Sequence, residues 1–126
     1  MQPNLAVSNG KYRDDHMEFD FSSHVVHLDA TTVSLTHKEH ALLALMVQHA
    51  GEIVPRVALL ERVWGYGADI RTRTLDVHIR RLRIKLGIYA QRYIETIFGV
   101  GYRFQPYRST TFFQSEQGPP PFQMTA

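Results

Sequence analysis

The sequence contains no cysteine among its 126 residues. This absence excludes a disulfide framework, a thiolate metal site and a cysteine nucleophile. The chain also has no apolar run that approaches the roughly 18 residues of a membrane-spanning helix. The first 15 residues lack the apolar core of a signal peptide. A cytoplasmic protein that does not contact a membrane is therefore expected.

The sequence motifs of common catalytic sites are missing as well. There is no glycine-rich loop that could hold phosphates and no nucleophile elbow. No acid, base and nucleophile set is recognisable, so neither enzymatic activity nor a cofactor is expected. Seven histidines are present, including the pairs in 24-HVVH-27 and 37-HKEH-40. The first pair points to opposite faces of a strand and the second supplies at most two ligands, so no metal site is predicted.

Positive charge is concentrated in one segment. Residues 71–92 carry seven Lys or Arg residues against one aspartate, a net charge of +6, whereas the rest of the chain carries seven positive and eleven negative residues, a net −4. A local basic cluster is the pattern expected for a polyanionic partner. A solvated helix face is the alternative explanation.

The composition predicts one packed domain with tails. A chain of 126 residues that is 44% hydrophobic has enough apolar side chains for one core and is too short for two domains. We predict a flexible N-terminal segment over residues 1–15, the folded domain over 16–107 and a disordered tail over 108–126, where Gly-Pro-Pro-Pro occurs.

Short β-prone runs dominate the first part of the domain. Residues 18–21, 25–28 and 32–35 are separated by polar turns, which predicts a small antiparallel meander. Residues 52–56 form a further strand-like link between two helical patterns.

Two helices are predicted around this link. Thr36 and Glu39 form a T-x-x-E capping box, so the first helix is expected to begin there and to reach Ala50, with Gly51 as its left-handed cap. Gly65 is expected to end the second helix. Both helices carry apolar faces for the core, formed by Leu42, Leu43, Leu45, Met46 and Ala50 in the first and Val57, Leu59, Leu60, Val63 and Trp64 in the second.

The third helix, predicted over about residues 72–86, has two contrasting faces. Its apolar stripe consists of Leu75, Ile79, Leu82 and Leu86, and its opposite side consists of Arg73, Val77, Arg80, Arg81 and Ile84. Asp76 precedes Arg80 by one turn and is predicted to pair with it. An exposed valine among arginines suits a thymine methyl group, while the arginines can reach guanine edges or phosphates.

The last structured segment is a hairpin. Residues 92–104 alternate in β-prone fashion around Gly99 and Gly101. A small antiparallel sheet, three helices and a C-terminal hairpin make an α+β domain of the winged helix-turn-helix class. In that architecture the third helix enters the major groove of DNA.

Three strings carry a resemblance to a known family: 36-THKEHALLALMVQHAGEIVPRVALLERVWG-65, 73-RTLDVHIRRLRIKL-86 and 96-TIFGVGYRF-104. They resemble the effector domain of OmpR/PhoB-type response regulators, over residues 18–105. The resemblance implies a four-stranded N-terminal sheet, three helices and a wing. It also implies a sequence-specific transcriptional regulator of a two-component system, with double-stranded DNA as its partner.

The resemblance also assigns residues. Arg73 and Thr74 match positions that hold phosphates, and the major-groove surface matches Val77, His78, Arg80, Arg81 and Arg83. The full set predicted to contact DNA is Arg71, Arg73, Thr74, Val77, His78, Arg80, Arg81, Arg83, Thr96 and Phe98. The loop matched to RNA polymerase contact in such regulators consists of Gly65, Tyr66, Gly67, Ala68, Asp69 and Ile70.

Two features depart from the family pattern. Members carry arginine at the start of the wing turn, where this chain has Phe98. The phenylalanine is expected either to pack back onto the domain near Tyr102 or to lie against the sugar-phosphate backbone. The receiver domain usually found upstream is absent, which indicates a fragment or a stand-alone effector. Such domains also occupy direct-repeat sites side by side, so pairing on DNA is expected.

One alternative function remains at this point. A winged helix can serve protein interaction, with its basic face docked on an acidic partner. DNA binding differs from this alternative in its steep salt dependence and its preference for particular duplex sequences.

Overall fold

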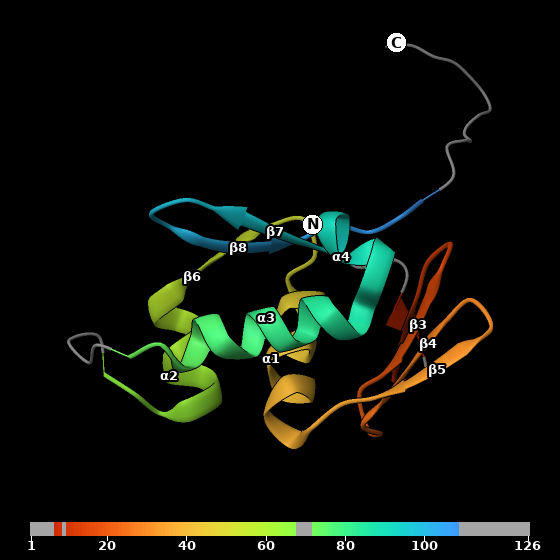
Figure 1. Cartoon of the computed structure of the whole chain (residues 1–126), viewed down its shortest axis with the longest axis horizontal. Helices are drawn as coiled ribbons and strands as arrows, with labels where there is room; N and C mark the ends of the chain where they lie inside the picture. The colour runs from red at the N-terminus through yellow and green to blue at the C-terminus, as the bar shows by residue number, and fades with distance from the viewer. Residues whose placement is uncertain (1–6, 9, 68–71, 109–126) are drawn as a thin grey trace, which may run out of the picture.

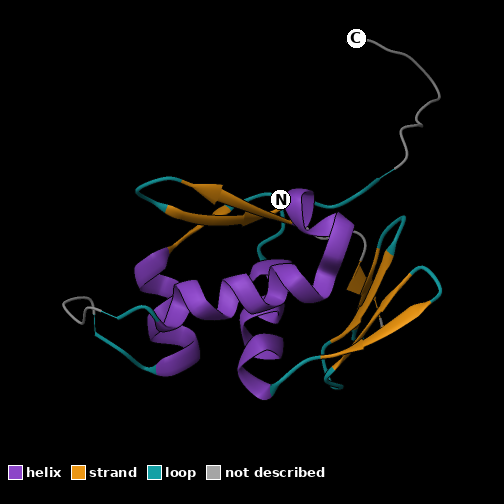
Figure 2. Cartoon of the chain, viewed as in Figure 1, coloured by secondary structure: helices purple, strands orange, loops and turns teal. Residues whose placement is uncertain are grey.

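The computed structural model describes residues 7–8, 10–67 and 72–108. Its elements are β1 (Val7–Ser8), β2 (Lys11–Arg13), β3 (Met17–Asp20), β4 (Val25–Leu28), β5 (Thr31–Ser34), α1 (His37–Gln48), β6 (Ile53–Pro55), α2 (Arg56–Trp64), α3 (Thr74–Leu86), the 3-10 helix η1 (Gly87–Tyr89), α4 (Ala90–Tyr93), β7 (Ile94–Ile97) and β8 (Gly101–Phe104). Figure 1 shows α3 crossing α1, with the β7–β8 hairpin along one side and the strands β3 to β5 beyond the C-terminal end of α3. The colouring of Figure 2 separates the helical centre from these two β regions. The predicted α+β winged helix-turn-helix class is confirmed.

The N-terminal sheet contains one strand more than the resemblance implied. Five antiparallel strands follow the order β1-β2-β3-β4-β5. The prediction of a flexible segment over residues 1–15 is wrong for β2, where Tyr12 is fully buried and pairs with Phe19. A three-residue strand with a single buried side chain is too short to show an alternating apolar pattern in the sequence. It is stabilised by pairing with its neighbouring strand.

The capping box of α1 forms as predicted. The Glu39 backbone N–H donates to Thr36 Oγ1 over 3.2 Å, and the Thr36 backbone N–H donates to Glu39 Oε1 over 2.9 Å. The helix ends at Gln48, earlier than the predicted Ala50. Gly51 does adopt a positive φ, but its N–H donates to the carbonyl of Phe104 in β8 and so directs the chain towards the second sheet.

The second helix matches its prediction at its end and differs at its start. Gly65 follows Trp64 with a φ of 80°, the left-handed conformation expected of a C-terminal glycine. Val57, predicted to be part of the core, is 45% exposed. It lies about 200° around the helix from Leu59, which is fully buried.

The hairpin is held to the start of α2 through a three-stranded sheet of order β6-β8-β7. Gly101 in β8 pairs with Pro55 in β6. A Cβ atom at Gly101 would lie 2.1 Å from the carbonyl oxygen of Val54, which leaves no room for any other residue. This close approach holds β8 against β6 at the turn end of the hairpin, where Gly101 also pairs with Ile97.

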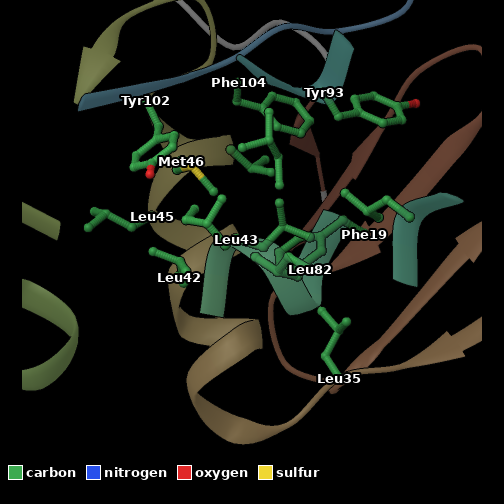
Figure 3. Close-up of a cluster of buried hydrophobic side chains, with 14 of the residues drawn as sticks. Phe19, Leu35, Leu42, Leu43, Leu45, Met46, Leu82, Tyr93, Tyr102 and Phe104 are labelled. Carbon is green, nitrogen blue, oxygen red and sulfur yellow. The ribbon is translucent and has the colours of Figure 1, made fainter. Parts of the chain in front are cut away.

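Figure 3 shows the core in which the helices and the sheets meet. Leu82 of α3 lies among side chains that include Leu43 of α1 and Phe19 of β3. The rings of Tyr93 and Phe104 stack at 5.3 Å, and Tyr12 meets Phe104 edge-on at 5.4 Å. The buried side of α3 is therefore anchored in the common core of the domain.

Asp14 connects the two ends of the described domain. Its carboxylate accepts hydrogen bonds from the hydroxyls of Tyr12 and Tyr93, each over 2.6 Å. It also accepts from the backbone N–H groups of His16, Met17 and Tyr107. One side chain thereby joins the N-terminal sheet, α4 and the segment that follows β8.

An ion pair between a buried carboxylate and a partly exposed lysine joins α1 to α3. Lys85 Nζ lies 2.6 Å from Glu39 Oε1 and also donates to the carbonyl of Ser34 over 3.2 Å. Glu39 is 1% exposed. Burial would raise the pKa of Glu39, but the hydrogen bond and charge of Lys85, together with the Thr36 backbone N–H, outweigh it and lower the pKa. Glu39 is therefore charged at neutral pH.

Candidate nucleic-acid interface

The start of α3 is built by two threonines. Thr72 Oγ1 accepts from the backbone N–H of Thr74 over 3.1 Å, and its own hydroxyl donates to Thr74 Oγ1. The helix begins at Thr74, two residues after the predicted start, and its N-cap residue Arg73 makes no side-chain capping bond. Asp76 in the first turn and two cations in the last turn both suit the helix dipole.

The two predicted faces of α3 are confirmed. Leu75, Ile79, Leu82 and Leu86 are at most 1% exposed. On the opposite face Val77 is 40% and Ile84 68% exposed. Arg73, Arg80 and Arg81 are exposed, and none of the three makes a side-chain hydrogen bond or ion pair with another described residue. Three guanidinium groups without a partner among the described residues are therefore available on one surface.

The pair between Asp76 and Arg80 that their one-turn spacing predicted does not form. Asp76 accepts instead from Arg56 of α2 over 2.7 Å, and the hydroxyl of Tyr102 in β8 lies 3.4 Å away. The Asp76 hydrogen bond raises the pKa of Arg56, against the opposing effect of burial. Packing of α2 against α3 brings in a partner 20 positions away, which a rule based on one helical turn does not consider.

Arg83 is turned towards the hairpin. Its Nη2 donates to the carbonyl of Ile94 and to Thr96 Oγ1, each over 2.7 Å. Its guanidinium also lies 5.8 Å from the ring centre of Tyr102. Two predicted DNA-contact residues, Arg83 and Thr96, are thus bonded to one another and link α3 to β7.

His78 lies between the two faces of α3, as predicted. Its Nδ1 is 2.9 Å from the carbonyl oxygen of Thr74, and its ring meets Trp64 edge-on at 4.9 Å. Trp64 is partly buried and packs against the core, in agreement with its predicted structural role. His78 is therefore held in place by α2 and by its own helix.

The hairpin tip places Phe98 in solvent. Phe98 is 90% exposed, so the expectation that it packs back near Tyr102 is wrong. The N–H of Val100 donates to the carbonyl of Ile97, and Gly99 has the positive φ that a type II turn requires at its third position. The turn therefore presents Phe98 at its outermost corner.

Part of the predicted contact set lies outside the described residues. This applies to Arg71 and to Ala68, Asp69 and Ile70 of the predicted polymerase-contact loop. Within the described part of that loop, Gly65 and Gly67 are exposed, whereas Tyr66 is partly buried against the core.

Comparison with known proteins assigns the chain that carries this surface to a family. Residues 30–104 match the family model described as "Transcriptional regulatory protein, C terminal". This match covers more than half of the chain. The chain belongs to this family. The region matched begins directly before β5 and ends with β8, so it contains α3 and the whole hairpin.

Relatives of this transcriptional-regulator family agree with that assignment. The transcriptional regulatory protein HprR of Escherichia coli is 43% identical over 89 residues, which are 70% of this chain and 40% of HprR. ResD of Bacillus subtilis is 40% identical over 93 residues, 71% of this chain and 39% of ResD. The chain thus spans about two fifths of the length of these curated relatives. The Klebsiella pneumoniae RstA DNA-binding domain, solved in complex with the RstA box, is 31% identical with a TM-score of 0.70, over 77% of this chain and 98% of that one.

Several contacts in this transcriptional-regulator domain escaped sequence reasoning. Arg56 approaches the hairpin through Asp76 and Tyr102, and no local spacing indicates it. Among the histidines, the ring centre of His24 lies 5.3 Å from that of His37 and 4.8 Å from that of His40. The two histidine motifs therefore meet in the structure. Within the described residues no group of three His, Cys, Asp or Glu side chains is arranged to hold a metal ion.

An open groove lies beside the last turn of α3. It has a volume of about 630 Å³, and its walls come from α3, η1 and α4 on one side and from β7 on the other. Arg83, Ile88, Thr96 and Phe98 line it.

No helix in the described part of the chain is long and apolar enough to cross a membrane.

Proposed function

We propose that this domain binds double-stranded DNA sequence-specifically, as the effector part of a transcriptional regulator, with α3 in the major groove. One observation carries the proposal: Arg73, Arg80 and Arg81 are exposed around Val77, without a partner in the described part of the chain, on a helix whose other face is buried. Arginine attracts phosphates and can donate two hydrogen bonds to guanine, while a valine methyl suits thymine. The RstA domain crystallised with its DNA box supports this function.

Roles can be proposed for the individual residues. Arg73 and Thr74, at the first turn of α3, would hold phosphates, and Val77, Arg80 and Arg81 would meet base edges. Arg71, His78, Arg83, Thr96 and Phe98 complete the proposed contact set. Arg83 has the smallest share in base recognition, because its guanidinium is bonded to β7.

The wider setting also belongs to the proposal. We propose a two-component regulator acting in the cytoplasm, without enzymatic activity or a cofactor of its own. RNA polymerase, contacted through residues 65–70, and a second copy of the domain on direct-repeat DNA are the proposed further partners. No contact within the described residues bears on either partner, so both remain predictions.

A salt titration tests the central proposal. The duplex would first be enriched by the chain from a pool of randomised DNA. Logarithmic affinity should then fall linearly with logarithmic salt concentration, with a slope of about −0.9 for each phosphate neutralised. Scrambled duplexes should bind at least about 1000-fold more weakly at physiological salt. A weak salt slope with no enriched sequence would instead favour docking of the basic face on an acidic protein.

Substitutions on α3 should separate specificity from affinity. Arg80→Ala or Arg81→Ala should cost about 1–3 kcal/mol on the enriched duplex and little on scrambled DNA, if the guanidinium reads a base. Arg73→Ala should weaken both duplexes alike, because phosphates are the same in every sequence. Binding isotherms on the two duplexes provide the measurement. Equal losses for all three variants on both duplexes would leave only non-specific attraction.

The isolated chain is expected to be monomeric. The longest described helix, α3, has 13 residues, which is too short for a stable coiled-coil dimer, and one of its faces is already buried. Sedimentation of the free chain at micromolar concentration should give a single monomeric species. On a duplex with two direct repeats, two chains should bind. A tight dimer in the absence of DNA would contradict this expectation.

A further inference from the structure

The most exposed large apolar side chain of the described domain is Phe98, at the tip of the hairpin. Its neighbour across the turn, Val100, is 46% exposed. Exposed aromatic side chains at a projecting tip contribute nothing to the core, and burying one in a complex is favourable. The position of Phe98 therefore leaves its ring available for contact with a partner.

The hairpin offers its partner apolar surface and almost no free charge. Between Ile94 and Phe104 the sequence contains a single cation, Arg103. Arg103 lies 2.9 Å from Glu95 in an ion pair, and that pair lowers the pKa of Glu95. Phe98 itself has no group that can donate a hydrogen bond to a phosphate. Electrostatic attraction thus cannot be the main contribution of the tip.

The neighbourhood of Phe98 identifies what the tip can reach. Phe98 lines the open groove of about 630 Å³ together with Arg83 of α3. When a helix lies in the major groove, one sugar-phosphate strand borders it, and the minor groove lies beyond that strand. The open groove, bounded by Arg83, η1 and α4 on one side and by β7 on the other, is the space that this strand can occupy. The residue on the far rim, Phe98, then stands over the minor groove.

We propose that Phe98 inserts as an apolar wedge between two base pairs of the minor groove and bends the duplex. The inference rests on the proposed DNA binding and extends it from base contacts to DNA shape. Apolar side chains that enter the minor groove partly unstack a base step and bend DNA by about 20–90°. A single projecting ring is too small for a stable protein interface, which buries about 800 Å² on each partner.

The proposal gives the hairpin a sequence preference without hydrogen bonds to bases. TA and CA/TG steps unstack more easily than others, so the wedge should favour such a step at a fixed distance from the sequence read by α3. The burial of the ring and the cost of unstacking are of similar size and opposite sign. Affinity should therefore change by less than about tenfold when the ring is removed.

The first test compares duplexes enriched from randomised DNA by the full chain and by its variants. Wild type and Phe98→Leu should enrich the same central sequence and a flexible step in one flank. Phe98→Ala should keep the central sequence and lose the flanking preference. Phe98→Arg should exchange the flexible step for an A·T-rich flank and steepen the salt dependence by about one ion, because arginine favours a narrow minor groove. Ile53→Ala is the matched control, since Ile53 is also an exposed apolar side chain, at 42%, but lies on β6 and does not line the groove.

The second test observes unstacking directly. With 2-aminopurine placed at each flanking position of the wild-type duplex, its fluorescence should rise about twofold or more at one step when wild type, Phe98→Leu or Ile53→Ala binds. It should stay unchanged with Phe98→Ala. Energy transfer between labels at the two ends should report a bend for the same three proteins.

The possible outcomes distinguish failure of the wedge proposal from failure of the proposed DNA binding. Binding to the enriched duplex with no unstacking and no bend in the wild type would overturn the wedge and leave DNA binding in place. Loss of a second bound copy in Phe98→Ala, with no change in fluorescence, would assign the tip to a contact between copies and also overturn it. An equal effect of Ile53→Ala would show a general apolar contribution and would also overturn the wedge. If no duplex is enriched at all, the proposed function itself fails.

Discussion

Replacing Lys85 with methionine is expected to lower the free energy of unfolding by about 3–5 kcal/mol, because the buried carboxylate of Glu39 loses its charged partner. Methionine retains most of the aliphatic length of lysine, so the loss reflects the charge rather than a cavity. Urea unfolding at pH 7 gives the measurement. A change below about 1 kcal/mol would show that water enters and solvates Glu39.

Two variants control this experiment. Arg81→Met removes a cation from the same helix, but Arg81 is exposed and makes no ion pair within the described residues, so its effect should stay within about 0.5 kcal/mol. The double variant Glu39→Gln with Lys85→Met should recover part of the loss, because no uncompensated charge then remains in the core.

The same pair gives a pH dependence of known sign. The folded state lowers the pKa of Glu39 below its ordinary value of 4.5. The stabilisation is therefore fully present above pH 4.5 and is lost as the pH falls through the lower folded value. In Glu39→Gln this part of the acid dependence should disappear, which unfolding measurements between pH 3 and pH 7 would show.

Asp14→Ala is expected to destabilise the domain by about 3–5 kcal/mol, since hydrogen bonds to a charged group contribute about 1.5–3 kcal/mol each and several are lost together. The hydroxyls of Tyr12 and Tyr93 would lose their acceptor inside the domain, where both side chains are fully buried. Asp29→Ala is the matched control: Asp29 also accepts from a tyrosine hydroxyl, that of Tyr89, but its side chain is 48% exposed. Its removal should cost less than about 1 kcal/mol. Similar losses in the two variants would contradict the special role of Asp14.

These tyrosines predict alkaline instability as well. Burial, reinforced by Asp14, raises the pKa of Tyr12 and of Tyr93 above the ordinary value of 10.0. The folded state keeps their protons where the unfolded chain would lose them, so stability is retained below pH 10 and falls as the pH rises further.

Local patterns in the sequence were sufficient for most of the fold. The T-x-x-E spacing at Thr36 and Glu39 and the leucine and isoleucine stripe of α3 each depend on neighbours within a few residues, and the structure shows both. Tyr12 was missed because its burial depends on pairing with β3 and on Asp14, and neither leaves a periodic signal. The five-stranded sheet therefore exceeds what periodicity could predict.

The candidate interface was likewise predictable from the sequence only in part. Exposure of Arg80 and Arg81 follows from helical geometry and was predictable. The choice of Arg56 as the partner of Asp76 is made by the packing of α2 on α3, which a one-turn spacing rule cannot represent. The orientation of Phe98 likewise depends on the turn that β7 and β8 impose.

The bonds of Arg83 to Ile94 and Thr96 have a consequence for the entropy of binding. They hold the hairpin against α3 in the free domain, and Arg56 with Asp76 and Tyr102 adds a second link. When side chains or loops become ordered only on binding, the lost conformational entropy costs about 0.5–1.5 kcal/mol for each immobilised rotamer-rich side chain. In this domain that ordering is completed during folding. The helix and the hairpin therefore approach a ligand as one preorganised body, and little of the free energy of association is lost to fixing one relative to the other.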